Sequence, residues 1–153
     1  TEPLRQKWLD WRRDNITAVV AGVSEALRRD RPKVEISAAV FANWPADRDA
    51  VGQDWKLWCE RGYLDFVCPM DYTADPAEFA SLVRRQRRWA GKVPCYPGIG
   101  VSCWDARGDV LKLISCIRAT RRAGTGGFTV FNYDTVTARQ VVPLCGLGVT
   151  RRP

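Results

Sequence analysis

The sequence predicts an α/β protein built from parallel strand–helix units, and three observations support this. Residues 63–69 form a short apolar, β-branched and aromatic run, typical of a strand that is buried on both faces. A capping box follows, with Asp75 as the expected N-cap, Pro76 at the first helical position and Glu78 at the third. Helical and strand patterns alternate along the whole chain with short connections, which favours parallel strands and right-handed crossovers.

The first third of the chain begins with a long helical pattern. Apolar residues recur at three- and four-residue spacing over residues 4–29, which predicts an amphipathic helix that ends before Pro32. The sequence of residues 34–41 predicts a strand, and its small residues at 37–39 suit a crowded sheet. A loop is expected over residues 42–49. A short helix then starts near residue 53 and stops at Gly62, a plausible left-handed C-terminal position.

The remaining elements continue the same alternation. After the strand at residues 63–69 we expect Asp71 to lie in the loop that leads to the capped helix. The further predictions are a helix over residues 76–90, a strand over 93–101, a helix over 108–122, a strand over 126–133 and a short closing helix over 138–144. The Gly98-Ile99-Gly100 sequence is only a weak signal for a nucleotide-binding turn, because the next helix begins several residues later.

The composition limits the chemistry that the chain can perform. The 153 residues carry a formal net charge of +7 and no His, so the commonest general base and metal ligand is absent. The six Cys contain no CxxC pair, and we therefore expect no metal and no cofactor. Cys68, Cys95 and Cys116 are expected as buried free thiols. Pairing of Cys95 with Cys103, or of Cys145 with either, stays open in an oxidising compartment.

The positive charge and the ends of the chain add further expectations. Most arginines lie in helical patterns, as expected for solvated outer faces, and no stacking platform accompanies them, so nucleic acid is not the predicted partner. No apolar run is long enough to span a membrane. The chain begins at Thr1 rather than at a methionine, and we expect it to be a piece of a longer polypeptide or a processed product.

Several stretches of the sequence together resemble the glycosyl hydrolase-like 10 family. They are residues 11–16, 36–41 and 53–55, the run from Gly62 to Val67, Pro69-Met70-Asp71-Tyr72, and 96–100. The resemblance implies a (β/α)₈ barrel, which needs about 250 residues, and a glycosidase role in a bacterial protein that is secreted, periplasmic or lipid-anchored. The sequence alone does not give the location. Residues 1–153 would form a single domain, the C-terminal half of the barrel from its fourth helix to its eighth strand.

The same resemblance singles out Asp71. At the top of the sixth barrel strand, Asp71 would be the general acid or acid/base of glycoside hydrolysis, a reaction that takes two carboxylates. Apolar neighbours would raise its pKa. The second carboxylate would follow the fourth barrel strand, upstream of Thr1, so the chain alone is expected to be inactive. The alternative is that Asp71 caps the next helix or accepts hydrogen bonds from backbone amides.

A group of polar and aromatic residues is predicted to bind the sugar, because most of them directly follow predicted strands at one end of the sheet. The group is Asn43, Trp44, Asp54, Tyr72, Trp104, Asn132 and Tyr133. Core packing is the alternative for any single aromatic residue, and stabilisation of a helix N-terminus is the alternative for Asp54. Asp65, at the start of its strand, is expected in a structural ion pair.

Three functions compete at this point. The leading interpretation is a glycoside hydrolase that acts on a polysaccharide or oligosaccharide. The second is a non-catalytic glycan-binding module, and the third is a basic nucleic-acid binder, whose binding would weaken steeply with salt. The strands at the two edges of a half-barrel would lack partners, so self-association through these edges is also expected.

Overall fold

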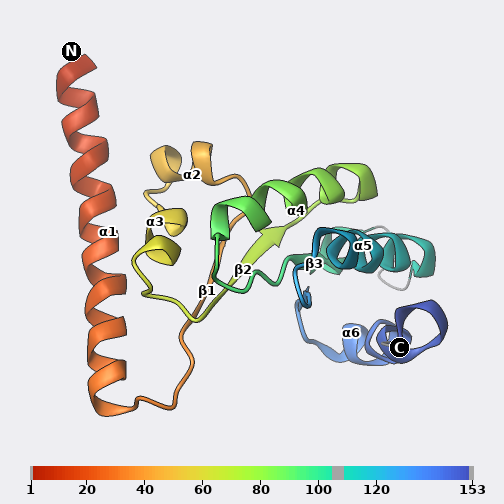
Figure 1. The fold of residues 1–153 in the computed structure, drawn as a ribbon. Coiled ribbons are helices and arrows are strands. Elements are labelled where there is room, and N and C mark those ends of the chain that lie inside the picture. The colour runs from red at the N-terminus through yellow and green to blue at the C-terminus, as the bar shows by residue number, and fades with distance from the viewer. Residues whose placement is uncertain (1, 105–108, 152–153) are drawn as a thin grey trace.

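A computed structural model describes residues 2–104 and 109–151, and a four-stranded parallel sheet lies at its centre (Figure 1). The strands are β1 (Ser37–Phe41), β2 (Phe66–Asp71), β3 (Gly98–Gly100) and β4 (Thr129–Phe131). The helices are α1 (Glu2–Asp30), α2 (Trp44–Ala50), α3 (Trp55–Glu60), α4 (Pro76–Ala90), α5 (Val110–Ala123) and α6 (Thr135–Gln140). Three 3₁₀ turns complete the described chain: η1 (Val101–Cys103), η2 (Val142–Gly146) and η3 (Gly148–Thr150).

The order of the strands in the sheet identifies the architecture. Each strand lies beside its sequence neighbour, in the order β1-β2-β3-β4, and all pairs are parallel. A doubly wound sheet would instead reverse its strand order at a switch point. Because successive crossovers have the same hand, the connecting helices gather on one face of the sheet. This is the arrangement of half a (β/α)₈ barrel, and it confirms the predicted fold class.

The long N-terminal helix forms as predicted, but a different face of it is buried. Partly buried Ile16, Val20 and Leu27 pack against the core, and α1 contacts α2 and α3. Trp8 and Trp11, two large apolar residues of the predicted helix, are 52% and 63% exposed. Helix α1 therefore carries two apolar stripes, and only one of them is covered by the described chain.

Several predicted boundaries are wrong. Residues 44–50 form α2 instead of a loop, because Pro45 in the first turn is compatible with a helix start. Asp71 is the last residue of β2 instead of a loop residue. Only half of the predicted capping box forms. Asp75 acts as the N-cap and accepts a hydrogen bond from Ala77 N at 2.8 Å. The Glu78 carboxylate accepts a hydrogen bond from the Thr73 hydroxyl instead of from the Asp75 backbone N–H.

The helix-covered face of the sheet holds two hydrophobic clusters. The first lies between β1, β2, α3 and α1 and contains Val40, Trp55, Trp58 and Val67. The second joins α4, β3 and α5 and contains Phe79, Ile99 and Ile117. Cys68, Cys95 and Cys116 are buried free thiols, as predicted. Of the helices in residues 2–104 and 109–151, none combines the length and the apolarity that a membrane span requires.

We call the opposite face of the sheet the open face, because no helix within residues 2–104 and 109–151 lies over it. Two glycines of β3 allow aromatic rings from neighbouring segments to lie close to this face. A Cβ atom at Gly98 would come 2.4 Å from the Phe131 ring, and one at Gly100 would come 2.6 Å from the Tyr72 ring. The spacing that weakly suggested a nucleotide-binding turn therefore has a packing explanation: these glycines sit inside a strand beneath two aromatic rings.

The free edge of β1 is partly covered by side chains. Phe41 N–H donates to Gln53 Oε1 at 2.9 Å, and the Trp55 indole N–H donates to the Phe41 carbonyl at 3.2 Å. The Ile36 carbonyl accepts from Asp65 N in the segment that leads into β2. Because backbone groups alternate in direction along a strand, the N–H and C=O groups of Ser37 and Ala39 point to the free edge.

Candidate functional site

A cavity of about 410 Å³ lies at the carboxyl ends of β1 and β2. In parallel α/β folds, ligands bind at this end of the sheet. Three segments line the cavity: the end of β1 with the first turn of α2, the end of β2, and one side of α4. The lining residues are Phe41, Ala42, Asn43, Asp47, Met70, Tyr72, Thr73, Glu78, Leu82 and Arg85. Two of the predicted site residues, Asn43 and Tyr72, are among them.

Three charged residues of the cavity were not predicted as site residues. Asp47 Oδ2 accepts a hydrogen bond from Asn43 N at 2.7 Å, and Glu78 accepts one from the Thr73 hydroxyl. Arg85 has no hydrogen bond or ion pair within the described residues, and its buried Nε lacks an acceptor there. Its guanidinium lies 5.8 Å from the centre of the Trp89 ring. The i, i+4, i+7 spacing of Glu78, Leu82 and Arg85 could have indicated this shared face of α4.

Asp71 does not line this cavity, although both of its neighbours do. Its side chain is fully buried, and its Oδ1 accepts a hydrogen bond from Gln86 Nε2 at 2.5 Å. The same amide nitrogen donates to the Ala42 carbonyl at 3.0 Å. Because side chains alternate along a strand, Met70 and Tyr72 lie on the cavity side while Asp71 turns toward α4.

Burial changes the protonation of Asp71. Loss of solvent raises the pKa of this carboxyl to about 7, and the hydrogen bond from Gln86 opposes the rise in part. Its Oδ2 and Gln86 Oε1 have no hydrogen-bond partner within the described residues. Near neutral pH, Asp71 therefore exists partly as the protonated acid. This is the state that a general acid needs before it can donate a proton.

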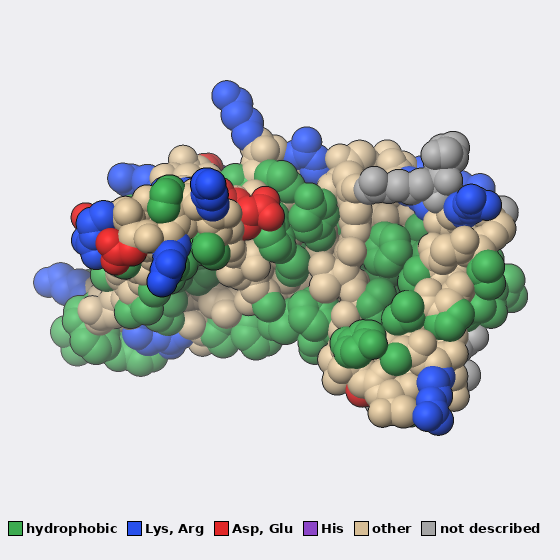
Figure 2. All heavy atoms as spheres, turned by 90° about the horizontal axis from the view of Figure 1, so that it is seen from below, with side chains coloured by type: hydrophobic (Ala, Val, Ile, Leu, Met, Phe, Trp, Pro, Cys, Tyr) green, Lys and Arg blue, Asp and Glu red, His purple; other side chains and the backbone are tan. Residues whose placement is uncertain are grey.

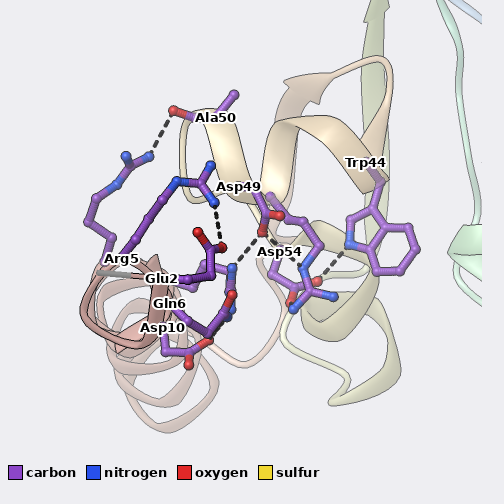
Figure 3. Close-up of polar contacts among 11 residues, drawn as sticks. Glu2, Arg5, Gln6, Asp10, Trp44, Asp49, Ala50 and Asp54 are labelled. Atoms are coloured by element: carbon purple, nitrogen blue, oxygen red, sulfur yellow. Dashed lines mark hydrogen bonds and ion pairs between the residues drawn. The ribbon is translucent and has the colours of Figure 1, made fainter. Parts of the chain in front are cut away.

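Trp44 and Asp54 form a polar contact with each other near the cavity (Figure 3). The Trp44 indole N–H donates to Asp54 Oδ1 at 2.6 Å, and Arg48 lies 3.5 Å from Asp54 Oδ2. The Trp44 ring also packs against Trp89 of α4, with ring centres 5.9 Å apart. These contacts link α2, α3 and α4. Trp44 and Asp54 therefore hold these helices together, and neither residue lines the cavity.

The remaining predicted residues differ in exposure. Trp104 is 5% exposed within the second hydrophobic cluster, and its indole N–H donates to the Thr73 carbonyl at 3.1 Å. Asn132 is exposed, and Tyr133 is 81% exposed, directly after β4. The Phe131 ring contacts the Tyr72 ring edge to face at 5.8 Å. Tyr72 thus connects the cavity with the end of β4.

Asp65 has the structural role that was predicted. It pairs with Arg28 at 3.0 Å and accepts a hydrogen bond from Ile36 N at 2.7 Å. The hydrogen bond from Ile36, supported by Arg28, lowers the pKa of the Asp65 carboxyl below its usual value. The contact ties the C-terminal part of α1 to the segment that leads into β2.

Other parts of the described chain offer little catalytic chemistry. Burial raises the pKa of the Cys59 and Cys116 thiols to about 12, so neither is a thiolate nucleophile at neutral pH. Within the described residues, no three His, Cys, Asp or Glu side chains are grouped to hold a metal ion. A larger cavity of about 620 Å³ lies near Thr120, Phe128 and Thr150, before β4, and contains no predicted site residue.

The basic residues do not form a single patch on the face seen in Figure 2. Lys and Arg side chains are spread over both ends and the upper edge of this view, with apolar side chains between them. This distribution agrees with solvated helix faces, as the sequence indicated.

Comparison with known proteins gives a match to a family model and a similarity to curated proteins. A family model described as glycosyl hydrolase-like 10 matches residues 1–99, which include every residue of the 410 Å³ cavity. Glycosyl hydrolase DigH of Escherichia coli K12 and DigH of Shigella flexneri are each 30% identical to the chain over 77 residues. The aligned part is 41% of this chain and 18% of each relative, so the chain spans less than a fifth of the curated relatives it matches.

Proposed function

The chain belongs to the glycosyl hydrolase-like 10 family, and from this premise we propose that its cavity binds a glycan within an enzyme that hydrolyses glycosidic bonds of a polysaccharide. The position of the cavity is the observation that supports the proposal most. It lies inside the matched region, at the carboxyl ends of parallel strands, and combines the Tyr72 ring with carboxylate, amide and guanidinium groups.

The proposed chemistry is general acid–base catalysis by carboxylates. Glycoside hydrolysis takes one carboxyl group that protonates the leaving oxygen and a second that acts as base or nucleophile. We assign the acid to Asp71, because its raised pKa keeps a proton available near neutral pH. The second carboxylate would come from the strand-four segment of a complete barrel. For Asp71 to act, its hydrogen bond to Gln86 must open toward the cavity, whereas Glu78 already lines it.

The predicted sugar-binding residues divide into two groups. Asn43 and Tyr72 line the cavity, and Asn132 and Tyr133 extend the same end of the sheet toward β4, so these four are proposed to contact the glycan. Trp44, Asp54 and Trp104 are proposed to act indirectly. The first two hold α2 and α3 against α4, and Trp104 fixes the Thr73 carbonyl at the cavity wall.

A glycan-binding module without catalysis is the second candidate, and the burial of Asp71 favours it. The side chain has no exposed surface and is turned toward α4, so the described geometry gives a substrate no direct path to it. Such a module would keep the cavity and its aromatic residue and would not need a proton donor.

Carboxylate-to-amide variants of the longest gene product that carries this chain separate the two candidates. Asp71→Asn is expected to lower kcat on the hydrolysed polysaccharide by about 10²–10⁴-fold while substrate affinity and folding are retained. A substrate with a good leaving group needs less protonation and should be partly spared. Asp14→Asn, at an exposed position on α1, is the matched control and should keep the parental rate.

Two other outcomes would change the assignment, one of the general acid and one of the function. If Glu78→Gln loses activity and Asp71→Asn does not, the acid is the cavity carboxylate and the assignment to Asp71 is wrong. If the parent binds glycans from a polysaccharide panel but releases no reducing ends, the glycan-binding module is the correct function.

A further inference from the structure

Arg85 of the cavity differs from the other shielded arginines of the chain. Within residues 2–104 and 109–151, the other buried or half-buried arginines each pair with a carboxylate or donate to a backbone carbonyl. They are Arg12, Arg13, Arg48 and Arg87. Arg85 is half-buried and has no such acceptor among these residues. A shielded guanidinium loses part of its hydration, so a native fold that leaves it unpaired calls for an acceptor from a ligand.

Aromatic packing fixes the position of this side chain at the cavity wall. The Arg85 guanidinium lies 5.8 Å from the centre of the Trp89 ring. The Trp89 ring packs in turn against Trp44 and Trp55, with ring centres 5.9 Å apart in both pairs. Of the Arg85 nitrogens, Nε is the one that is both unpaired and closed to solvent, so the two terminal nitrogens stay accessible. A ligand that binds them therefore orders little further side-chain freedom.

Helix α4 separates Arg85 from the acidic residue at its own start. Glu78 lies in the first turn of α4, which follows the carboxyl end of β2. Arg85 comes seven residues later, about 10 Å further along the helix axis at about 1.5 Å per residue. Asp47 and Glu78 already accept hydrogen bonds, from Asn43 N and from the Thr73 hydroxyl. The cavity thus contains a cation whose charge no carboxylate of the described chain neutralises.

We propose that Arg85 binds the carboxylate of an acidic sugar, so that the substrate is a glycan with carboxyl groups on its sugar rings or on short side arms of them. This assignment rests on the proposed function and names the class of its substrate. The planar guanidinium presents donors that match the two oxygens of a carboxylate. Tyr72, which is 50% exposed and lines the same cavity, provides an aromatic surface for the sugar ring.

The charges of the cavity favour a substrate group with a single negative charge. The lining contains the carboxylates of Asp47 and Glu78 beside the Arg85 guanidinium. A phosphate monoester carries up to about two negative charges at neutral pH, so these carboxylates repel it more strongly than they repel a carboxylate. A neutral hydroxyl or amide oxygen also accepts from Arg85, but a hydrogen bond between two charged groups is about twice as strong.

Matched polysaccharides test this assignment in the longest gene product that carries the chain. The panel is polygalacturonate, alginate and carboxymethyl chitin. Each polymer is used with its carboxylates intact, with the carboxyl groups reduced to alcohols, and with the reduced form sulfated. The release of reducing ends gives kcat/KM, and titration calorimetry with oligosaccharides of the same forms gives the dissociation constant whether or not hydrolysis follows.

The parent is expected to prefer the carboxylated form of the glycan that it uses over the reduced form by at least tenfold. Arg85→Gln should remove this preference, mainly through a higher KM or dissociation constant for the carboxylated form. Arg85→Lys keeps the charge without the planar donor pair, so its preference should be intermediate. Arg84→Gln is the matched control, because Arg84 is exposed on the same helix outside the cavity lining, and it should keep the parental preference.

The remaining outcomes separate a wrong substrate class from a wrong function. If the parent uses the carboxylated and reduced forms equally, prefers the sulfated form, or keeps its preference in Arg85→Gln, Arg85 does not select a carboxylate, although the proposed function stands. Failure of Arg85→Gln to fold, read from its thermal unfolding, would assign Arg85 to an ion pair with another part of the polypeptide and would also overturn the assignment. A parent that neither binds nor hydrolyses any form of any panel glycan contradicts the proposed function as well.

Discussion

At the scale of single residues, the most unusual contact is the buried pair of Asp71 and Gln86. Both side chains have no exposed surface, and one hydrogen bond of 2.5 Å joins them. A carboxylate at this position lacks most of its solvation, so the folded protein favours the protonated form. The pair joins the end of β2 to the middle of α4 and fixes the direction of that helix beside the cavity.

The raised pKa of Asp71 predicts how stability depends on pH. In the unfolded chain this carboxyl has its ordinary pKa of 3.8, but burial raises the pKa in the folded chain to about 7. The contribution of Asp71 is therefore fully present below pH 4 and is lost progressively as the pH rises to 7. Asp71→Asn does not ionise, so its stability relative to the parent should increase by a few kcal/mol between pH 4 and pH 7.

Urea denaturation midpoints of parent and Asp71→Asn at pH 4.5, 6 and 7.5 measure this difference. Because other groups titrate equally in both proteins, the comparison isolates Asp71. A difference in stability that stays constant across the three pH values would contradict a raised pKa for this carboxyl.

Truncation of two of the predicted aromatic residues should change stability by very different amounts. Trp104→Ala removes a buried ring and its hydrogen bond to the Thr73 carbonyl, so we expect a loss of about 3–5 kcal/mol in unfolding free energy. Tyr133→Ala removes an exposed ring and should change stability by less than about 0.5 kcal/mol. Thermal unfolding measures both, and similar destabilisation by the two changes would contradict their assigned environments.

At the scale of elements, the helices were easier to predict than the strands. The periodicity of α1, α4 and α5 extends over many residues, and Asp75 marks the start of α4 as the sequence indicated. The strands β3 and β4 have three residues each, too few for any alternation to be recognised. Packing between neighbouring segments, which no local pattern records, sets their ends.

The position of Asp71 shows how a small boundary error changes a functional conclusion. The sequence placed it in a loop, where a side chain is free to reach a ligand. In the structure it is the last residue of β2, so the alternation of the strand decides its direction and turns it toward α4. Neither the composition nor any sequence motif indicated that the Asp71 side chain faces α4. Gln86, its partner, lies in an ordinary helical pattern and could not be identified from the sequence.

The close approach of strands to aromatic rings predicts that β3 requires its glycines. In Gly98→Ala the new methyl group would come 2.4 Å from the Phe131 ring and 2.7 Å from the Pro69 carbonyl oxygen. Because one of these neighbours is backbone, relief requires the strands to move apart, and we expect a loss of about 1–3 kcal/mol. Chemical denaturation followed by tryptophan fluorescence measures the loss.

Gly22→Ala is the matched control for this substitution. A Cβ atom at Gly22 in α1 meets no atom within 4 Å, and Ala favours a helix interior by about 1 kcal/mol over Gly. The control should therefore stabilise the chain. If Gly98→Ala is also neutral or stabilising, the described proximity of β3 to the Phe131 ring is incorrect.

At the scale of the whole molecule, one face of the sheet carries both hydrophobic clusters and the other carries exposed apolar rings. The order of elements along the chain predicted parallel strand–helix units, and the resemblance to a family predicted that these units form half a barrel. Which stripe of α1 is buried was not predictable, because both stripes are apolar and only the packing of α2 and α3 distinguishes them.

The open face predicts a concentration-dependent response to a hydrophobic dye. At low protein concentration the exposed rings near Phe41, Tyr72 and Tyr133 should bind 8-anilinonaphthalene-1-sulfonate and increase its fluorescence. As the concentration rises and copies associate, the fluorescence per chain should fall. Circular dichroism at each concentration controls for unfolding, and a constant signal per chain would show that association leaves the open face uncovered.

The hydrogen bonds that Gln53 and Trp55 make to Phe41 also restrict how the chain can assemble incorrectly. Amyloid fibrils grow when an exposed strand offers consecutive unpaired backbone groups as a template. On β1 this template ends before Phe41, because the outward N–H and C=O of that residue are already occupied by side chains from the following segment. An incoming strand finds only the groups of Ser37 and Ala39, a length too short to nucleate a fibril. Two side chains thus shorten the part of β1 that the folded chain offers to an incoming strand.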